Sequence, residues 1–212
     1  MSDRQLGLEK LLKLSRIVAV LVIEDAATAV PLARALVKGG VRLIEITLRT
    51  PAAWEAIRRI AGEVEDAVTG AGTILTPEQF AEADRVGCNF TVSPGATPRL
   101  IAAAAAVPTP WLPGAATASE MLLLLEHGYP LQKFFPAEQA GGAAYLKSLS
   151  SPLSAVRFCP TGGIDERNAA RYLELPNVLC VGGSWIAPAE LIRAGKWDAI
   201  TARAAEASGV PH

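Results

Sequence analysis

Short apolar runs recur along this chain at nearly even intervals, and this recurrence limits the possible folds more than any other feature. Eight runs start about 20 to 26 residues apart. They cover residues 17–23, 43–49, 67–74, 90–94, 111–115, 133–137, 157–163 and 178–185. That interval fits one strand, one helix and two short loops. Because runs this apolar are typical of parallel strands covered by helices, the pattern predicts an α/β chain of eight strand–helix units.

The segments between the runs carry helix signals. A threonine before a proline, which suits a helix start, occurs at Thr50-Pro51, Thr76-Pro77 and Thr97-Pro98. Glycines that suit helix ends stand at Gly39-Gly40, Gly87 and Gly128. Residues 6–14 are amphipathic and precede the first run, so we expect an extra N-terminal helix within residues 1–16 that covers the bottom of the fold.

Eight such units in 212 residues predict one domain, a (β/α)8 TIM barrel over residues 1–212. The alternative is an open doubly wound sheet, which also alternates strands and helices. No G-x-G-x-x-G follows the first run, where the chain reads Val-Ile-Glu-Asp-Ala at 22–26. The even spacing up to the last run also favours a closed barrel.

Composition excludes several classes of function. The formal net charge is −1 with both signs interspersed, so no basic field is available for nucleic acid or anionic lipid. Half the residues are hydrophobic and 19% are charged, which is typical of a folded chain. The first apolar run is too short to span a membrane and no targeting signal precedes it. These features predict a cytoplasmic protein.

Cysteine and histidine usage argues against a metal site. The cysteines at 88, 159 and 180 are widely spaced, and two fall inside apolar runs. We expect all three to be reduced core residues. The histidines are His127, at an apparent helix end, and His212, at the terminus. A Cys/His metal site needs clustered ligands, so none is expected.

The second run places polar side chains where a barrel strand should be apolar. With a period of two, Glu45, Thr47 and Arg49 share the face opposite to the one that the helices cover, so they point into the barrel. Buried ionisable groups cost free energy and are often retained for function. The alternative is a structural ion pair between Glu45 and Arg49.

Lys133 begins the sixth run and is followed by Phe-Phe-Pro-Ala. A lysine beside two phenylalanines and a proline is partly desolvated, and desolvation favours the neutral amine that attacks a carbonyl. The alternative is a solvated lysine at the start of a strand. Glu45 and Arg49 in the same interior favour the chemical interpretation, since they supply a general base and an anion-binding group.

Glycine-rich turns end three of the runs. Thr161-Gly162-Gly163 follows the seventh and Gly182-Gly183-Ser184 the eighth, where this fold commonly binds phosphate. Gly70-Ala71-Gly72-Thr73 ends the third, and the Thr73 hydroxyl can donate to a carboxylate. Each turn alone is also compatible with a plain tight turn.

Together these motifs resemble the 2-keto-3-deoxy-6-phosphogluconate (KDPG) aldolase / 4-hydroxy-2-oxoglutarate aldolase family over nearly the whole chain. The resemblance rests on Gly39-Gly40-Val41, Glu45-Ile46-Thr47-Leu48-Arg49-Thr50, Gly70-Ala71-Gly72-Thr73, Ser93-Pro94-Gly95, Lys133-Phe134-Phe135-Pro136-Ala137-Glu138, Phe158-Cys159-Pro160-Thr161-Gly162-Gly163 and Gly182-Gly183-Ser184.

The resemblance implies a role for each candidate residue. Lys133 corresponds to the Schiff-base lysine and Glu45 to the general acid/base. Arg49 and Thr73 match residues that hold the pyruvate carboxylate, and Thr161 lies where substrate hydroxyls pass. The phosphate-binding turns correspond to Gly162, Gly163, Gly183 and Ser184. The family implies a homotrimer without metal or other cofactor. Some relatives have an arginine where this chain has Val22, which shifts the expected phosphate binding toward backbone N–H groups.

The implied reaction is class I cleavage of a phosphorylated 2-keto-3-deoxy sugar acid to pyruvate and glyceraldehyde 3-phosphate, with 4-hydroxy-2-oxoglutarate as a further substrate. Three alternatives are distinguishable from it. One is an aldolase of the same family specific for the galactonate phosphate. The second is a metal-dependent sugar-phosphate epimerase or isomerase, and the third is a phosphate-binding barrel in which Lys133 and Glu45 only neutralise each other.

Overall fold

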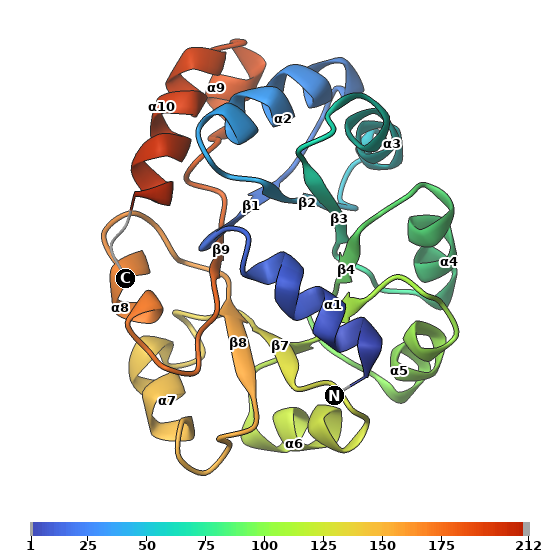
Figure 1. Cartoon of the computed structure of the whole chain (residues 1–212), viewed down its shortest axis with the longest axis vertical. Coiled ribbons are helices and arrows are strands. Elements are labelled where there is room, and N and C mark those ends of the chain that lie inside the picture. The colour runs from blue at the N-terminus through green and yellow to red at the C-terminus, as the bar shows by residue number, and fades with distance from the viewer. Residues whose placement is uncertain (1, 210–212) are drawn as a thin grey trace.

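The computed structural model describes residues 2–209 of the chain. Strands and helices alternate, and the strands curl around a common centre inside a layer of helices (Figure 1). The strands are β1 (Ile17–Leu21), β2 (Leu43–Thr47), β3 (Val68–Gly72), β4 (Phe90–Val92), β5 (Trp111–Leu112), β6 (Gly114–Ala115), β7 (Leu131–Phe134), β8 (Arg157–Pro160) and β9 (Val181–Gly183).

The helices lie mostly in the connections between strands. They are α1 (Asp3–Leu12), the 3₁₀ turn η1 (Ala26–Thr28), α2 (Ala29–Lys38), α3 (Ala53–Glu63), α4 (Pro77–Arg85), α5 (Pro98–Ala105), α6 (Ala118–Glu126), α7 (Gly142–Leu149), α8 (Ala169–Leu173), α9 (Ala189–Arg193) and α10 (Trp197–Ser208). None of the helices within residues 2–209 has the length and apolar character needed to cross a bilayer.

Every strand pairing within residues 2–209 is parallel. One sheet has the order β5-β4-β3-β2-β1-β9 and a second has the order β6-β7-β8. Single parallel bridges, Phe158 to Val178 and Thr161 to Gly182, connect the second sheet to the segment of β9. The predicted α/β class is therefore confirmed as a curled parallel sheet of the TIM-barrel-like class.

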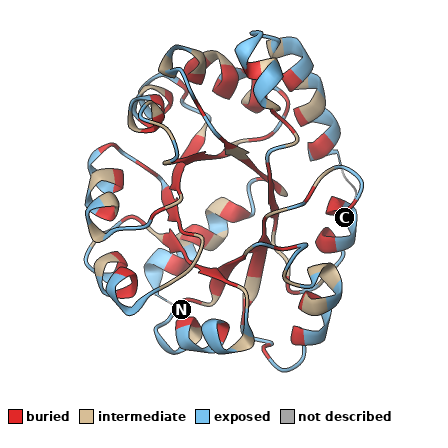
Figure 2. Ribbon diagram, turned by 180° about the vertical axis from the view of Figure 1, so that it is seen from behind, coloured by how far each residue is buried: buried red, intermediate tan, exposed pale blue. Residues whose placement is uncertain are grey.

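The two faces of the curled sheet bury different sets of side chains, as the period-two pattern predicts. Ile44 and Ile46 of β2 belong to the large core cluster between strands and helices, whereas Leu43 belongs to a smaller cluster inside the curl. Figure 2 shows the buried residues concentrated on the strands and on the inner sides of the helices. The outer face of the sheet is therefore apolar, whereas the inner face can carry polar side chains near the carboxyl ends of the strands.

Helix α1 packs against the inner cluster. Leu8 and Leu12 are 0% and 1% exposed and contact the same cluster as Leu43 and Leu131. Burial of a leucine side chain contributes about 1.5–3 kcal/mol. Because α1 occupies this end of the curl, the opposite end, where the strands finish, is the one available for a ligand.

Two of the three threonine–proline signals mark helix starts. Thr76 forms a capping box at α4 and the Thr97 hydroxyl accepts a hydrogen bond from the backbone N–H of Leu100 at α5. The third signal was wrong, because α3 begins at Ala53 and the Thr50 hydroxyl instead donates to the Ile23 carbonyl. The hydroxyl of such a threonine can bond a carbonyl beyond a neighbouring strand instead of capping the helix that follows it.

The cysteine prediction is confirmed for all three positions. Cys88, Cys159 and Cys180 are free and buried. Burial raises the pKa of Cys88 to about 12, so its thiol stays protonated at neutral pH.

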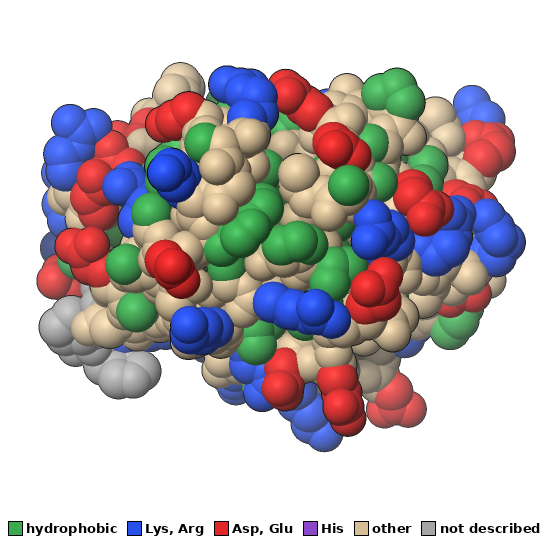
Figure 3. All heavy atoms as spheres, turned by 90° about the horizontal axis from the view of Figure 1, so that it is seen from above, with side chains coloured by type: hydrophobic (Ala, Val, Ile, Leu, Met, Phe, Trp, Pro, Cys, Tyr) green, Lys and Arg blue, Asp and Glu red, His purple; other side chains and the backbone are tan. Residues whose placement is uncertain are grey.

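On the surface, acidic and basic side chains are intermixed around hydrophobic ones, as Figure 3 shows for the face over α2 and α10.

Candidate active site

Lys133 and Glu45 meet inside the curl from β7 and β2. The lysine Nζ lies 3.1 Å from Glu45 Oε1 and 3.4 Å from Oε2. The two residues are 6% and 3% exposed. Lys133 is therefore not a solvated lysine at a strand start, and Glu45 pairs with it rather than with Arg49. Both of these alternatives from the sequence were wrong.

The position of Lys133 differs from the prediction in one respect. The strand β7 begins at Leu131, so Lys133 is its third residue and not its first. It lies opposite Gly114 of β6 and Cys159 of β8. Strand neighbours on both sides exclude water from the lysine stem, which explains its burial.

A glycine on the neighbouring strand makes room for the carboxylate of Glu45. A Cβ atom placed on Gly72 would lie 2.2 Å from Glu45 Oε1. The pair is thus fitted into a space that exists because β3 lacks a side chain there. Two charges taken out of water cost several kcal/mol each, so this ion pair is weak support for stability and stronger support for function.

A cavity of about 190 Å³ opens at the carboxyl ends of the strands. The Phe135 ring lines it, and the centroid of that ring is 5.4 Å from the Lys133 Nζ. The Thr161 hydroxyl is buried, has no hydrogen-bond partner among residues 2–209 and belongs to the same lining. The cavity is lined by Val20, Val22, Arg49, Phe135, Thr161, Gly162, Gly163, Ile164, Gly183 and Ser184.

Arg49 reaches this cavity from a turn just beyond β2. Arg49 is exposed, whereas Glu45 and Thr47 within β2 are buried. The turn is fixed to the end of β1 by two hydroxyls, because Thr47 donates to the Leu21 carbonyl and Thr50 to the Ile23 carbonyl. The guanidinium is thereby presented at the mouth of the cavity, where it can meet an anion.

The two glycine turns lie side by side in the cavity lining, because Thr161 pairs with Gly182. Gly162 and Gly163 have φ values of 104° and 74°, a backbone region that disfavours other residues. A Cβ atom on Gly183 would lie 1.7 Å from the Trp185 ring. Backbone N–H groups in turns of this kind bind anions, and Ser184 adds an exposed hydroxyl beside them.

Thr73, like the buried pair Lys133 and Glu45, is a predicted site residue that does not line the cavity. It directly follows β3 and is partly exposed. Its φ of 61° is unusual for a β-branched residue, and such conformations cost about 1–3 kcal/mol. Since Gly72 abuts Glu45, Thr73 lies one residue beyond the contact with the buried pair.

One polar contact near the site was missed by the sequence analysis. The Tyr172 hydroxyl of α8 donates to Glu138, which lies in the loop after β7. Burial and then the Glu138 carboxylate raise the pKa of Tyr172, so its hydroxyl stays protonated as a donor. The sequence signal was Glu138 within the motif Phe-Phe-Pro-Ala-Glu, but nothing in the sequence pointed to a tyrosine more than 30 residues away.

Over residues 2–209, no group of three or more His, Cys, Asp or Glu side chains is arranged to hold a metal ion. His127 lies at the end of α6 and its Nδ1 contacts the Leu123 carbonyl. His212 lies outside the described residues.

A curled parallel α/β sheet with a buried lysine–carboxylate pair beside a glycine-lined cavity defines a class to which Schiff-base-forming lyases belong. The family model "KDPG and KHG aldolase" matches residues 8–203. The KHG/KDPG aldolase of Escherichia coli strain K12 is 47% identical over 207 residues, which cover 98% of this chain and 97% of the relative. The chain belongs to the KDPG and KHG aldolase family.

Two solved structures extend the comparison. The KDPG aldolase of Legionella pneumophila, with pyruvate captured as a covalent carbinolamine intermediate, has a TM-score of 0.93 at 41% identity and covers 98% of this chain and 99% of its own. The KDPG aldolase of Zymomonas mobilis ZM4 with 3-phosphoglycerate has a TM-score of 0.90 at 47% identity, covering 99% and 97%. The resemblance inferred from the motifs is confirmed.

Proposed function

We propose that this protein is a class I aldolase that cleaves 2-dehydro-3-deoxy-6-phosphogluconate to pyruvate and D-glyceraldehyde 3-phosphate. The observation that carries the proposal is the buried Lys133–Glu45 contact of 3.1 Å beside a cavity with an anion-binding arginine and two glycine turns. Two relatives named 2-dehydro-3-deoxy-phosphogluconate aldolase, at 48% and 50% identity over 98% and 95% of this chain, support the same substrate. The relative from Escherichia coli is named KHG/KDPG aldolase, which supports 4-hydroxy-2-oxoglutarate as a second substrate.

Lys133 is the nucleophile in this proposal. Its ammonium passes a proton to Glu45, and the neutral amine attacks the C2 ketone to give a carbinolamine. The protonated carboxyl of Glu45 then helps the hydroxyl leave as water, which gives a protonated imine. The pyruvate carbinolamine in the Legionella pneumophila aldolase supports this order of events.

Glu45 is the acid/base of the cleavage step. The imine accepts the electron pair of the C3–C4 bond, which leaves an enamine on the lysine and an aldehyde on the other fragment. Glu45 takes the proton from the C4 hydroxyl, through a water, as that bond breaks, and later returns a proton to C3. Addition of water to the new imine releases pyruvate and restores the amine, so no metal or other cofactor is required.

The remaining site residues bind the two ends of the substrate. Arg49, with Thr73, holds the carboxylate. The phosphate lies between the two glycine turns, which contribute Gly162, Gly163, Gly183 and Ser184. Thr161, whose hydroxyl has no partner in the described part of the chain, bonds a substrate hydroxyl between these ends. The hydrophobic Val22 in the same lining makes phosphate binding depend on backbone N–H groups.

Borohydride trapping with pyruvate tests the chemistry directly. A reduced pyruvyl adduct on Lys133, located by peptide mass spectrometry, is the expected result. An adduct absent from folded protein near neutral pH would remove Lys133 as the nucleophile and reopen the epimerase alternative. Proton exchange at the methyl group of pyruvate in deuterated water distinguishes the enzyme from a barrel in which Lys133 and Glu45 only neutralise each other's charge.

The assembly follows from the same proposal. The chain forms a single domain, a closed (β/α)8 barrel with α1 (Asp3–Leu12) as an extra helix over its bottom. It works as a cytoplasmic homotrimer. Light scattering of the purified protein is expected to give about three times the mass of the 22.2 kDa chain, and the mass of a monomer would contradict the trimer.

A further inference from the structure

The loop after β7 and the turn after β8 form one hydrogen-bonded unit. The backbone N–H of Ala137 donates to the Thr161 carbonyl at 2.8 Å, and that of Glu138 donates to the Gly162 carbonyl at 3.1 Å. The first loop carries Phe135, whose ring lies over the Lys133 Nζ. Through these bonds the turn proposed to bind phosphate is connected directly to the segment that covers the reactive lysine.

Packing leaves little free space between the two segments. A Cβ atom on Gly162 would lie 3.2 Å from the Pro136 Cα, and one on Gly163 would lie 2.8 Å from the Glu138 Cβ. The glycines therefore allow the backbones to approach closely. Because the two backbones are hydrogen-bonded and in close contact, a shift of one segment is expected to move the other.

Two side-chain bonds fix this unit to the scaffold from outside. Tyr172 of α8, which is 1% exposed, donates to the Glu138 carboxylate. Asn168, which precedes α8, donates to the Gly163 carbonyl at 2.9 Å and accepts from the Asp165 N–H. Both contacts arise from the same short stretch around α8, and neither residue lines the cavity.

We propose that Glu138, Tyr172 and Asn168 are positioning residues that hold the Gly162–Gly163 turn at a fixed distance from Lys133, and so set the preference for phosphorylated substrates. The inference rests on the proposed function, since it takes Lys133 as the nucleophile and the turn as the phosphate site. None of the three contacts the reacting atoms. Their effect is on the phosphate end of the substrate, whereas pyruvate, which lacks that end, does not depend on them.

The test compares steady-state constants for the KDPG substrate and for unphosphorylated 4-hydroxy-2-oxoglutarate. Tyr172→Phe and Asn168→Ala are expected to raise KM for KDPG about three- to tenfold, because the lost hydrogen bonds let the turn move. KM for the unphosphorylated substrate and the yield of the pyruvate adduct on Lys133 stay within about twofold of wild type. Glu138→Gln, which keeps a carbonyl acceptor for Tyr172, is expected to retain more of the KDPG affinity than Glu138→Ala.

Tyr145→Phe is the matched control. Tyr145 lies on the neighbouring α7, its ring stacks on Phe134, and the substitution removes a phenol hydroxyl that is not bonded to Glu138. If Tyr172→Phe behaves like this control, or if KM rises equally for both substrates, the positioning role is refuted. The exposed Glu138 variants keep the test valid if a change at buried Tyr172 impairs folding. Absence of a pyruvate adduct in the wild-type protein would instead refute the proposed function itself.

Discussion

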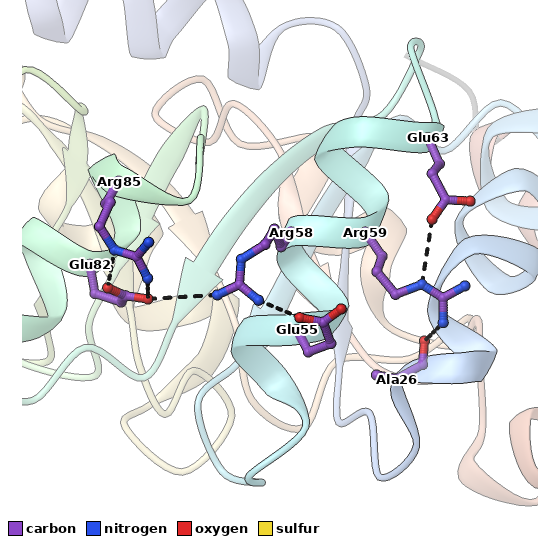
Figure 4. A network of polar contacts seen from close by, with 7 residues as sticks. All are labelled: Ala26, Glu55, Arg58, Arg59, Glu63, Glu82 and Arg85. Carbon is purple, nitrogen blue, oxygen red and sulfur yellow. Dashed lines mark hydrogen bonds and ion pairs between the residues drawn. The ribbon is translucent and has the colours of Figure 1, made fainter.

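Among residues 2–209, ion pairs lie both inside the curled sheet and on its outer helices. Inside, Lys133 and Glu45 are 6% and 3% exposed and face each other from strands far apart in sequence. Outside, Glu82 of α4 lies between Arg85 of the same helix and Arg58 of α3, as Figure 4 shows. The distances are similar, since Arg85 lies 2.6 Å from Glu82 and Lys133 lies 3.1 Å from Glu45.

The surroundings of the two pairs differ much more than their geometry. The outer pairs stay hydrated and screened by salt, so each contributes little to stability. The inner pair is shielded from water, so each charge is compensated mainly by the other. Removal of either side chain would leave its partner buried and unpaired. The comparison favours the proposed chemical role for the inner pair, whereas the outer network supports solubility and local order.

Lys133→Ala is expected to give the largest effect. It removes the proposed nucleophile, so turnover should fall about 10⁴-fold or more. The pyruvate adduct should disappear, and stability should fall by about 3–5 kcal/mol because Glu45 is left buried without its partner. Steady-state rates, borohydride trapping and urea denaturation measure the three effects. Lys147→Ala, on the exposed side of α7, is the control and should change none of them.

Glu45→Gln tests the proposed acid/base role of Glu45 separately from the proposed nucleophilic role of Lys133. The amide keeps the shape of the side chain but cannot take a proton, so turnover should fall about 10²–10⁴-fold. Pyruvate should still be trapped on Lys133, although more slowly. Wild-type turnover in this variant would show that the inner pair is only structural and would remove the distinction drawn from the outer network.

Gly72→Ala disturbs the inner pair without changing either charge. Its new methyl group would lie 2.2 Å from Glu45 Oε1, so the carboxylate must move away from Lys133. Turnover is expected to fall about 10- to 100-fold, with the pyruvate adduct retained. Gly62→Ala is the matched control, because apart from its chain neighbours and its own helix backbone no atom of residues 2–209 lies within 4 Å of its Cβ position. That control should gain about 0.5–1 kcal/mol of stability at unchanged turnover.

Much of this architecture was predictable from local sequence. The spacing of apolar runs predicted the alternating elements, and the period of two in β2 placed Glu45 on the inner face. The start of β7 was wrong because Gln132 interrupts the apolar pattern. That residue is fully buried, and its side-chain amide donates to the Met121 and Tyr129 carbonyls. A polar side chain whose partners lie outside its own strand looks like a loop residue in the sequence.

The contacts that join separate loops were not predictable in this way. Tyr172 contacts Glu138, and the Thr50 hydroxyl serves the end of β1 instead of capping its own helix. Each depends on tertiary placement of segments that have no shared periodicity. The resemblance to a family supplied the roles of Arg49 and the glycine turns, but it did not indicate which side chains hold those turns in place.

Glu82→Gln in the outer network is expected to give the smallest effect. The hydrogen bond from Arg85 lowers the pKa of Glu82 below its ordinary value of 4.5. A lowered pKa in the folded state means that the carboxylate stabilises the fold above pH 4.5 and loses this contribution as the pH falls through the lowered value. Calorimetry at pH 7 should therefore show a fall in Tm of no more than about 2 °C. Salt at 0.5 M should reduce this difference, and it should disappear at a pH well below the lowered pKa of Glu82. Turnover should not change. A loss of stability as large as that of Lys133→Ala, or one that salt leaves intact, would show that the outer network is as poorly hydrated as the inner pair, and burial would then not explain the difference between them.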